Sequence, residues 1–238
     1  MKKKLFVIGV GGLTGSKLVE IGKDDFEIFG SYNYRDPKSS IVKNVNLDIT
    51  NSSKIRDILE KIKPDIVINT AGINNVDYCE KYPDEATKIN IQAVKEICQI
   101  TKENGIKFVQ LSSDSVFDGT EQLPYEETDY PKPINYYGKT KIQSEKIVLE
   151  NPINVVVRAS VLYGYLSDNL AQIESSSKKS INFGQWLINK LILNEKLKII
   201  TDEYSSPIIV DDFARSILHI IKHEKSGLFH SAPKLQIT

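Results

Sequence analysis

Leu5-Phe6-Val7-Ile8-Gly9-Val10-Gly11-Gly12-Leu13-Thr14-Gly15, at residues 5–15, decides the fold of this chain. A short apolar run, typical of a buried strand, leads into glycines spaced G-x-x-G-x-x-G, and a helical pattern follows through Leu18, Val19 and Ile21. Glycines in such a turn let a pyrophosphate approach the backbone amides and the positive end of the helix. Glycines also mark ordinary turns, but the strand-turn-helix context favours a dinucleotide site. We assign to this site Gly9, Gly12, Leu13, Thr14 and Gly15.

Outward from this turn, short apolar runs alternate with helical patterns along the chain. This alternation is typical of a parallel sheet covered on both faces, so we predict an α/β fold with a doubly wound, Rossmann-like sheet. The expected strands are Leu5–Ile8, Glu27–Ser31, Val45–Leu47, Asp65–Asn69, Ile106–Leu111, Asn154–Arg158 and Leu197–Ile200. The expected helices include Ser52–Ile62, a longer one from Pro83 to Gly105, and Asn135–Glu150.

The end of the second expected strand indicates which dinucleotide is bound. An acidic residue there would bond the ribose hydroxyls of NADH and repel a 2'-phosphate, and none occurs between Ser31 and Arg35. Arg35 could instead accept the 2'-phosphate of NADPH as a forked donor. Asp36 follows it and Arg35 could also be a solvated loop residue, so NADH stays open as an alternative. Tyr34 and Arg35 are counted as cofactor residues.

Two further stretches carry candidate chemistry. Ser112-Ser113-Asp114 supplies hydroxyls, and Tyr137-Gly138-Lys139-Thr140-Lys141 places a tyrosine and a lysine on one helix face. The cation of Lys141 is expected to lower the pKa of the Tyr137 phenol, which would make it a general acid or base. The second Tyr-x-x-x-Lys pair, Tyr34 with Lys38, is discarded because Pro37 interrupts any helix there.

Composition narrows the class of protein. The chain has 238 residues, with Lys+Arg 31 and Asp+Glu 31, so no basic excess points to nucleic acid or an anionic membrane. The apolar run after Lys2–Lys4 is too short for a signal peptide or a membrane span. Cys79 and Cys98 lack metal-ligand spacing, and a reduced, cytoplasmic location is expected.

Other polar residues receive structural interpretations. His219, His223 and His230 have no accompanying carboxylate motif, so we predict no metal site. Asp211 and Asp212 precede a helical pattern and are expected to cap that helix.

Taken together, these residues resemble the extended short-chain dehydrogenase/reductase family, and within it the dTDP-4-dehydrorhamnose reductase branch. Leu47-Asp48-Ile49-Thr50 looks like the stretch that meets the adenine, and Asn69-Thr70-Ala71-Gly72 looks like a strand end that lines the cofactor. Residues 111–119 are similar to the branch's S-T-D-Y-V-F-D-G run, and residues 137–141 match its Y-G-K-T-K. The resemblance implies NADPH-dependent reduction of the 4-keto group of a nucleotide sugar. Ser113, Tyr137 and Lys141 would be catalytic, and Asp48, Ile49, Thr70, Ala71, Gly72, Tyr137 and Lys141 would contact the cofactor.

Two departures from the branch concern the sugar. Ser115 stands where the branch has a tyrosine, and Val161 replaces a tryptophan, so stacking surface is lost. The residues assigned to the substrate are Ser113, Asp114, Ser115 and Val161, while Asn182 and Phe183 could border the sugar and Trp186 is expected in the core or at a dimer contact.

A second function stays open beside the reductase. Residues 158–164, with the serine-rich stretch that follows them, also look like the regulatory beta subunit of methionine adenosyltransferase, which serves a partner enzyme. Family members usually add helical structure after the position of His230, so we expect an NADP-binding domain at residues 1–160 and a partial C-terminal substrate lobe at 161–238. A homodimer is also left open.

Overall fold

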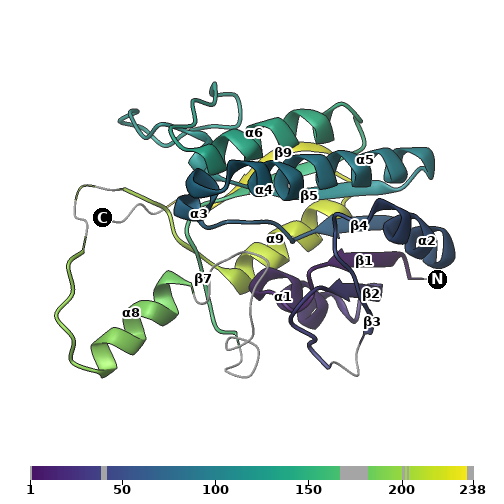
Figure 1. Cartoon of the computed structure of the whole chain (residues 1–238), viewed down its shortest axis with the longest axis horizontal. Helices are drawn as coiled ribbons and strands as arrows, with labels where there is room; N and C mark the ends of the chain where they lie inside the picture. The colour runs from purple at the N-terminus through teal and green to yellow at the C-terminus, as the bar shows by residue number, and fades with distance from the viewer. Residues whose placement is uncertain (1, 39–41, 167–181, 200–201, 203, 235–238) are drawn as a thin grey trace.

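The computed structural model describes residues 2–38, 42–166, 182–199, 202 and 204–234. Within them a parallel sheet has the strand order β3-β2-β1-β4-β5-β6-β9 (Figure 1). Its strands are β1 Lys4–Ile8, β2 Glu27–Tyr32, β3 Lys43–Asn46, β4 Ile66–Asn69, β5 Lys107–Ser113, β6 Val155–Ala159 and β9 Gly227–Ser231. The order runs outward from β1 in both directions, so the doubly wound α/β fold predicted from the sequence is confirmed.

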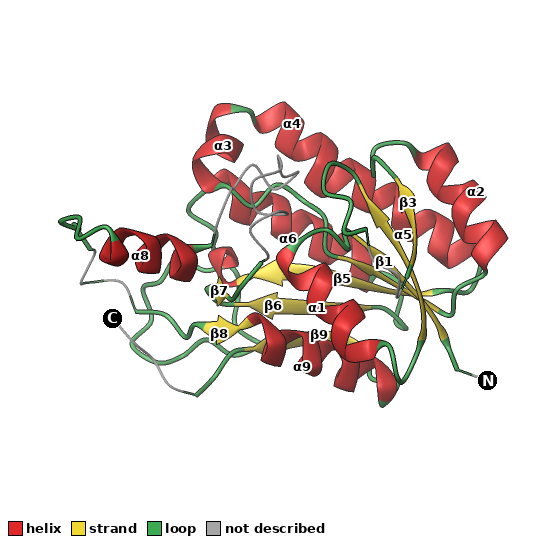
Figure 2. Ribbon diagram, turned by 90° about the horizontal axis from the view of Figure 1, so that it is seen from below, coloured by secondary structure: helices red, strands yellow, loops and turns green. Residues whose placement is uncertain are grey.

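The sheet separates two hydrophobic cores because successive side chains of each strand point to opposite faces. In β1, Leu5 and Val7 join the core beneath α1 (Leu13–Gly22) and α9 (Val210–Lys222). Phe6 and Ile8 face the other core, beneath α2 (Ser52–Ile62), α5 (Ala93–Glu103) and α6 (Tyr136–Leu149). Figure 2 shows this arrangement, with α1 and α9 side by side on one face.

Local signals define the helices that were predicted. The Asn51 side chain accepts a hydrogen bond from Lys54 N at the start of α2, and Lys63, with φ 52°, ends it before Pro64. The bounds predicted for this helix are therefore correct. The predicted helix from Asn135 to Glu150 is also present, with Asn135 as the N-cap of α6 and its side chain bonded to Gly138 N.

The long helix predicted from Pro83 has a more varied form. It consists of α4 (Pro83–Thr87), a π-helical turn at Lys88–Gln92 and α5, and it follows the short helix α3 (Val76–Lys81). Gly105, with φ 65°, comes just after its end, as predicted. The π turn directs Asn90 inward, where its side chain bonds Ile73 N, Ile73 O and Thr140 Oγ1. Asn90 therefore ties this helix to α6, which is a structural role.

The last predicted strand is wrong. Residues 197–199 form no strand, and Ile200 lies outside the described residues. The seventh strand of the sheet is β9 instead. It begins with a glycine and most of its residues are only partly buried, so the sequence gave no clear strand signal. Leu162–Tyr163 and Ile208–Ile209 form a separate small sheet, β7 and β8, which was not expected. These short strands have no local pattern, so only their partners determine them.

The C-terminal part of the chain returns to the main sheet through α9 and β9, after α8 (Phe183–Ile192). The expected capping role of Asp211 and Asp212 is wrong, because the N-cap of α9 is Ile209. Both acids lie in the first turn instead, where negative charge suits the helix dipole, and Asp211 also pairs with Lys17 at 3.2 Å. The division at residue 160 stays a prediction, and the serine-rich stretch lies outside the described residues.

Candidate functional site

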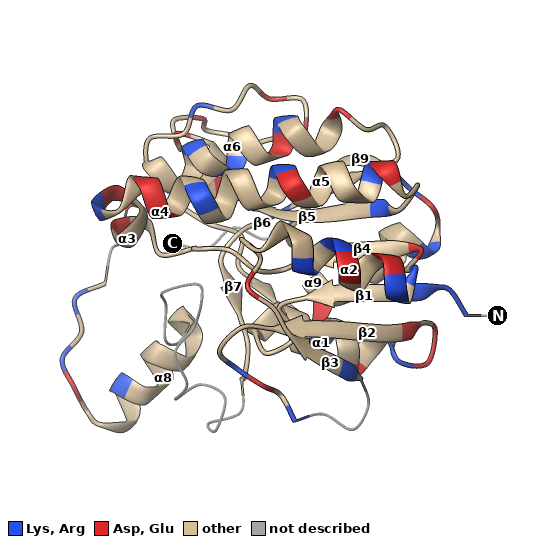
Figure 3. Cartoon of the chain, turned by 45° about the vertical axis from the view of Figure 1, so that its right-hand side comes forward, with Lys and Arg blue, Asp and Glu red and all other residues tan. Residues whose placement is uncertain are grey.

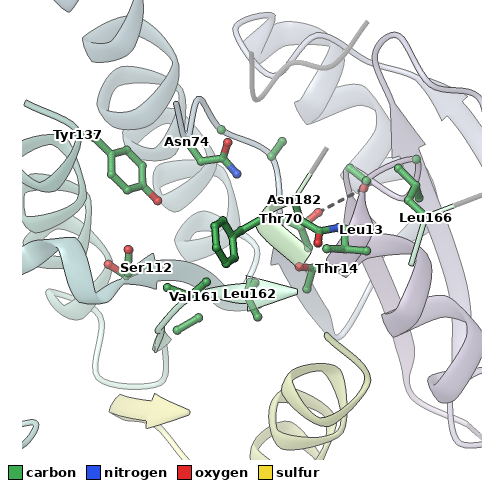
Figure 4. A pocket seen from close by; sticks show the side chains of 18 of the residues that line it. Leu13, Thr14, Thr70, Asn74, Ser112, Tyr137, Val161, Leu162, Leu166 and Asn182 are labelled. Carbon is green, nitrogen blue, oxygen red and sulfur yellow. Dashed lines mark hydrogen bonds between the residues drawn. The ribbon is translucent and has the colours of Figure 1, made fainter. Parts of the chain in front are cut away.

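A cavity of about 520 Å³ lies at the carboxyl ends of the strands, where open α/β sheets bind ligands. It is bordered by the glycine turn, by the ends of β2, β4 and β5, by the start of α6 and by the start of α8. Figure 4 shows Tyr137 and Ser112 at one side of it, Leu13 and Thr14 at the other, and Val161 between. The predicted site residues found in its lining are Gly9, Gly12, Leu13, Thr14, Tyr34, Arg35, Thr70, Ala71, Gly72, Ser113, Asp114, Ser115, Tyr137 and Val161.

The glycine turn is packed so closely that side chains are excluded. Gly9 has φ 93°, and its N–H and that of Val10 both donate to Ser31 O, at 2.8 and 2.9 Å. A Cβ on Gly11 would lie 1.9 Å from Arg35 O, and one on Gly15 would lie 2.2 Å from Gly9 O. Gly15 therefore lies beneath the turn rather than in the cavity lining, and it permits the close packing of α1 on β1.

The amino end of α1 fits a pyrophosphate. Its N-cap is Gly12, which has no side chain to accept from the first-turn amides. Leu13 and Thr14, the first two residues of α1, line the cavity, so this helix end faces it. Backbone N–H groups and the positive end of the helix dipole together favour a phosphate ligand.

Arg35 borders the cavity beside the glycine turn. Its residue is only 8% exposed, and this burial lowers the pKa of its guanidinium. A guanidinium is charged at any physiological pH, so Arg35 brings fixed positive charge to this edge of the cavity. Tyr34, beside it, is about half exposed.

A smaller adjoining hollow contains the residues expected near the adenine. Asp48 and Ile49 line it together with Ala71 and Gly72, which also border the main cavity. Asp48 Oδ1 accepts hydrogen bonds from Thr50 N and Thr50 Oγ1, both at 2.9 Å, which fixes the loop after β3. The two hollows are therefore continuous through the end of β4.

The end of β5 presents a cluster of hydroxyls around a carboxylate. Ser113 Oγ donates to Asp114 Oδ1 at 2.9 Å, and Ser160 Oγ donates to Asp114 Oδ2 at 2.8 Å. Ser115 N donates to Ser113 Oγ at 3.2 Å. Asp114 is thus held by its neighbours, while Ser113 and Ser115 remain in the cavity lining.

The Tyr137 phenol is buried at the start of α6, and its pKa differs from the expectation. Burial raises the pKa, a hydrogen bond with Ser113 lowers it, and the charge of Asp114 raises it. The predicted lowering of the Tyr137 pKa is wrong for this structure, because removal from water is the largest influence and raises the pKa. The phenol therefore keeps its proton at neutral pH, the form that an acid requires, and Ser113 lies next to its oxygen.

Lys141 lies behind the phenol rather than in the cavity lining. Its Nζ donates to Leu111 O at 3.0 Å and lies 5.5 Å from the centre of the Tyr137 ring. Burial lowers the pKa of Lys141 to about 8, and the charge of Glu145 acts in the opposite direction. A Cβ placed on Gly72 would lie 3.9 Å from Nζ, so the lysine also reaches the end of β4.

Several cavity residues were not assigned from the sequence. They are Gly11, Tyr32, Asn33, Asn74, Val76, Ser112, Ala159, Ser160, Leu162, Leu166 and Gln185. Most lie in the last residues of strands or in the loops that follow them, and position at the end of a strand was the available signal. Asn182 and Phe183 do border the cavity, as considered from the sequence. Trp186 is half-buried against the Phe183 ring, 5.7 Å away, rather than in the core.

The described part of the chain shows no group of three His, Cys, Asp or Glu residues that could hold a metal ion. Charges of both signs alternate along α2 and α5, without a stripe of one sign (Figure 3). Among the helices that the structure describes, none is long and apolar enough to cross a membrane.

Comparison with known proteins adds independent findings. Residues 3–238 match the family model for the RmlD substrate binding domain. A probable low-salt glycan biosynthesis reductase of Haloferax volcanii is 31% identical over 98% of this chain and 75% of its own length. The crystal structure of a dTDP-4-dehydrorhamnose reductase from Bacillus anthracis in complex with NADP superposes with a TM-score of 0.84, at 27% identity, over 100% of this chain and 77% of that one. The beta subunit of methionine adenosyltransferase 2 from Bos taurus is 31% identical over 77% of this chain and 56% of its own length.

Proposed function

We propose that this chain, which belongs to the RmlD substrate binding domain family, reduces the 4-keto group of a nucleotide-linked sugar with NADPH. Family membership confirms the resemblance drawn from the motifs, and it makes the chain an NADP-dependent oxidoreductase of the dTDP-4-dehydrorhamnose reductase type. The particular sugar and nucleotide are left to experiment, because Ser115 and Val161 replace aromatic residues in the cavity.

One observation carries the proposal: a buried, protonated phenol and a serine hydroxyl meet in the same cavity as a glycine turn that fits a pyrophosphate. Tyr137 comes from α6 and Ser113 from β5, and the Ser113 hydroxyl lowers the pKa of the phenol. Both lie at the carboxyl end of the sheet with Gly12 and Thr14. Reduction of a carbonyl needs this pairing of a proton donor with a cofactor site.

NADPH, when bound, supplies the hydride, and this chain's residues supply the proton and the electrostatics. The Ser113 hydroxyl donates to the substrate carbonyl oxygen as negative charge develops on it. Tyr137 gives its phenolic proton to that oxygen, and the ammonium of Lys141 stabilises the phenolate that remains. Arg35 would bind the 2'-phosphate, and Asp48 and Ile49 would border the adenine.

A titration with nucleotide sugars tests the function. The protein is loaded with NADPH, and NADPH absorbance is followed on addition of each member of a panel of 4-keto and 4-hydroxy nucleotide sugars. Oxidation of NADPH by a 4-keto sugar, and none by its 4-hydroxy counterpart, supports the proposal. If no 4-keto nucleotide sugar causes oxidation while NADPH still binds, the reductase proposal is wrong.

The regulatory subunit considered from the sequence is the second candidate. The similarity to the bovine beta subunit favours it, and the presence of Ser113, Tyr137 and Lys141 is compatible with either function. Mixing the protein with a methionine adenosyltransferase catalytic subunit and measuring its rate distinguishes the two functions. We also keep a cytoplasmic location, supported by the free, buried thiols of Cys79 and Cys98, and a homodimer as proposals that cell fractionation and sedimentation velocity would test.

A further inference from the structure

A buried ion pair joins α6 to the sheet one helical turn beyond Lys141. Arg158 Nε donates to Glu145 Oε1 at 2.9 Å and Arg158 Nη2 donates to Glu145 Oε2 at 2.7 Å, so the pair is bidentate. Both side chains are only 5% exposed, and Ser112 Oγ also donates to Glu145 Oε1. A buried pair costs desolvation energy and is a poor source of stability, which raises the question of what else it does.

The position of this pair is fixed by three neighbouring strands. Ser112 of β5 lies opposite Arg158 of β6, and Arg158 lies opposite His230 of β9. Arg158 Nη1 is 3.2 Å from His230 Nε2, and the guanidinium stacks 5.1 Å from the centre of the Phe117 ring. The Glu145 carboxylate is thus held by rigid elements rather than by a loop.

The same strand end holds the partners of the reactive groups. Leu111 O accepts the hydrogen bond from Lys141 Nζ, and Ser113 lies two residues further along β5. Ser112, between them, is the residue that bonds Glu145. Any movement of α6 relative to β5 would therefore change the distances from Lys141 and Tyr137, both on α6, to Ser113 on β5.

We propose that Glu145, clamped by Arg158 and Ser112, is a positioning residue that fixes α6 against the ends of β5 and β6 and so holds Lys141 charged and aligned with Ser113. This inference rests on the proposed reductase function of the cavity. Glu145 does not line the cavity, so it acts through Lys141 and Ser113 rather than on the substrate.

The charges around Lys141 make the inference measurable. Glu145 and Tyr137 face it from α6, and Cys79 faces it from α3, while Arg158 and His230 lie beyond Glu145. Burial raises the pKa of Cys79 to about 11 and lowers that of His230. Burial also raises the pKa of Tyr137, where Asp114 adds to the effect. Cys79, Tyr137 and His230 therefore hold a constant charge around pH 8, and Glu145 is the acid whose removal changes the field at Lys141.

The test is the titration of Lys141 itself. Protein carrying isotope-labelled lysine is titrated by NMR, and the Lys141 signal is identified by its loss in Lys141→Met. The midpoint in the parent protein is expected at about 8. In Glu145→Gln, which keeps the shape of the side chain but loses its charge, the midpoint of the Lys141 titration should fall by about 1 pH unit. The alkaline limb of the pH profile of kcat/KM should shift to lower pH by the same amount. The value of kcat/KM should therefore fall roughly 8-fold at pH 8.5 and hardly at all at pH 6.

Asn154→Ala is the matched control for loosening α6. Asn154 is buried at the opposite end of the same elements, where it accepts from Phe108 N and donates to Val148 O, each at 3.0 Å. The Asn154→Ala variant should have lower thermal stability but the same Lys141 midpoint as the parent protein. Glu145→Asp keeps the charge, so its Lys141 midpoint should lie close to that of the parent protein. Its kcat should be lower, because the shorter side chain breaks the bidentate contact.

An unchanged Lys141 midpoint and kcat/KM profile in folded Glu145→Gln would overturn the inference. If Glu145→Gln does not fold, the double variant Glu145→Gln/Arg158→Gln is titrated in its place, because it leaves no lone buried charge. Its Lys141 midpoint should be lower than that of the parent protein. An unchanged midpoint would again overturn the inference. A parent protein that turns over no sugar overturns the reductase function, and the NMR midpoints still decide the role of Glu145 at Lys141.

Discussion

Helix α6 and helix α8 border the same cavity, but the chain holds them in different ways. Eight residues of α6 are buried, including both reactive side chains Tyr137 and Lys141. In the part of the chain that the structure describes, α8 has no buried residue, and Ile188, Leu191 and Ile192 are more than half exposed. Figure 1 shows α8 at the end of the molecule away from the N-terminus.

This difference indicates a division of labour across the cavity. The α6 side is preorganised by packing, by Asn90 and by the Glu145–Arg158 pair, as catalysis requires of groups that stabilise a transition state. The α8 side is attached mainly through its amino end, where Asn182 bonds Gly164 O and Gln185 N. We therefore expect changes on α6 to affect rate and global stability, and changes on α8 to affect substrate binding.

Tyr137→Phe should have the largest effect. It removes the proton donor while keeping the ring, so the rate of NADPH oxidation with the accepted sugar should fall by roughly 10²- to 10⁴-fold. NADPH affinity, measured by fluorescence titration, should change little because the glycine turn is untouched. Tyr130→Phe, at an exposed tyrosine, is the control and should behave as the parent. A Tyr137→Phe protein as fast as the parent would place the proton donor elsewhere.

Arg35→Ala tests the cofactor side of the cavity. Loss of a charge-assisted bond should weaken NADPH binding by about 1.5–3 kcal/mol and leave NADH binding nearly unchanged. Dissociation constants for both cofactors measure this, and Arg35→Lys, which keeps a charge, should lose less. Equal affinity of the parent protein for NADPH and NADH would remove the basis of the prediction.

The packing contrast can be tested with one apolar truncation on each helix. Val148 is fully buried on α6. The substitution Val148→Ala should lower the free energy of unfolding by about 2 kcal/mol, because two methyl groups are lost and a cavity remains. Leu191→Ala, at a position 58% exposed on α8, should cost less than about 0.5 kcal/mol. Urea unfolding measures both. Equal costs would mean that α8 is covered in solution.

The two N-caps are expected to have a smaller effect than Val148→Ala. Asn135 and Asn182 each accept a backbone hydrogen bond in the first turn of α6 and α8, and replacing either by Ala should remove about 1 kcal/mol. In Asn135→Ala the loss should appear in the global free energy of unfolding. In Asn182→Ala it should appear as a severalfold higher KM for the sugar, with the NADPH dissociation constant unchanged. The reverse pattern would contradict the division of labour.

The sequence alone predicted the features that depend on short stretches of chain. The glycine spacing of residues 9–15 determines a tight turn at the amino end of a helix, because Gly9 has φ 93° and only glycine tolerates the 2.2 Å approach between a Gly15 Cβ and Gly9 O. Asn51 and Lys63 mark both ends of α2, and the i, i+4 spacing places Tyr137 and Lys141 on one face. These signals act within a few residues, so they can be read without the fold.

Tertiary structure decided what depends on partners distant in the chain. β9 forms a strand because β6 offers it an edge, whereas residues 197–199 remain outside the sheet. The pKa of Tyr137 rises rather than falls because burial, set by the packing of α6, is the largest influence on it. The contact between Glu145 and Arg158 likewise joins a helix to a strand. Such pairings and degrees of burial arise only when the sheet assembles, since hydrogen-bond partners and exclusion of water are properties of the whole fold rather than of a local pattern.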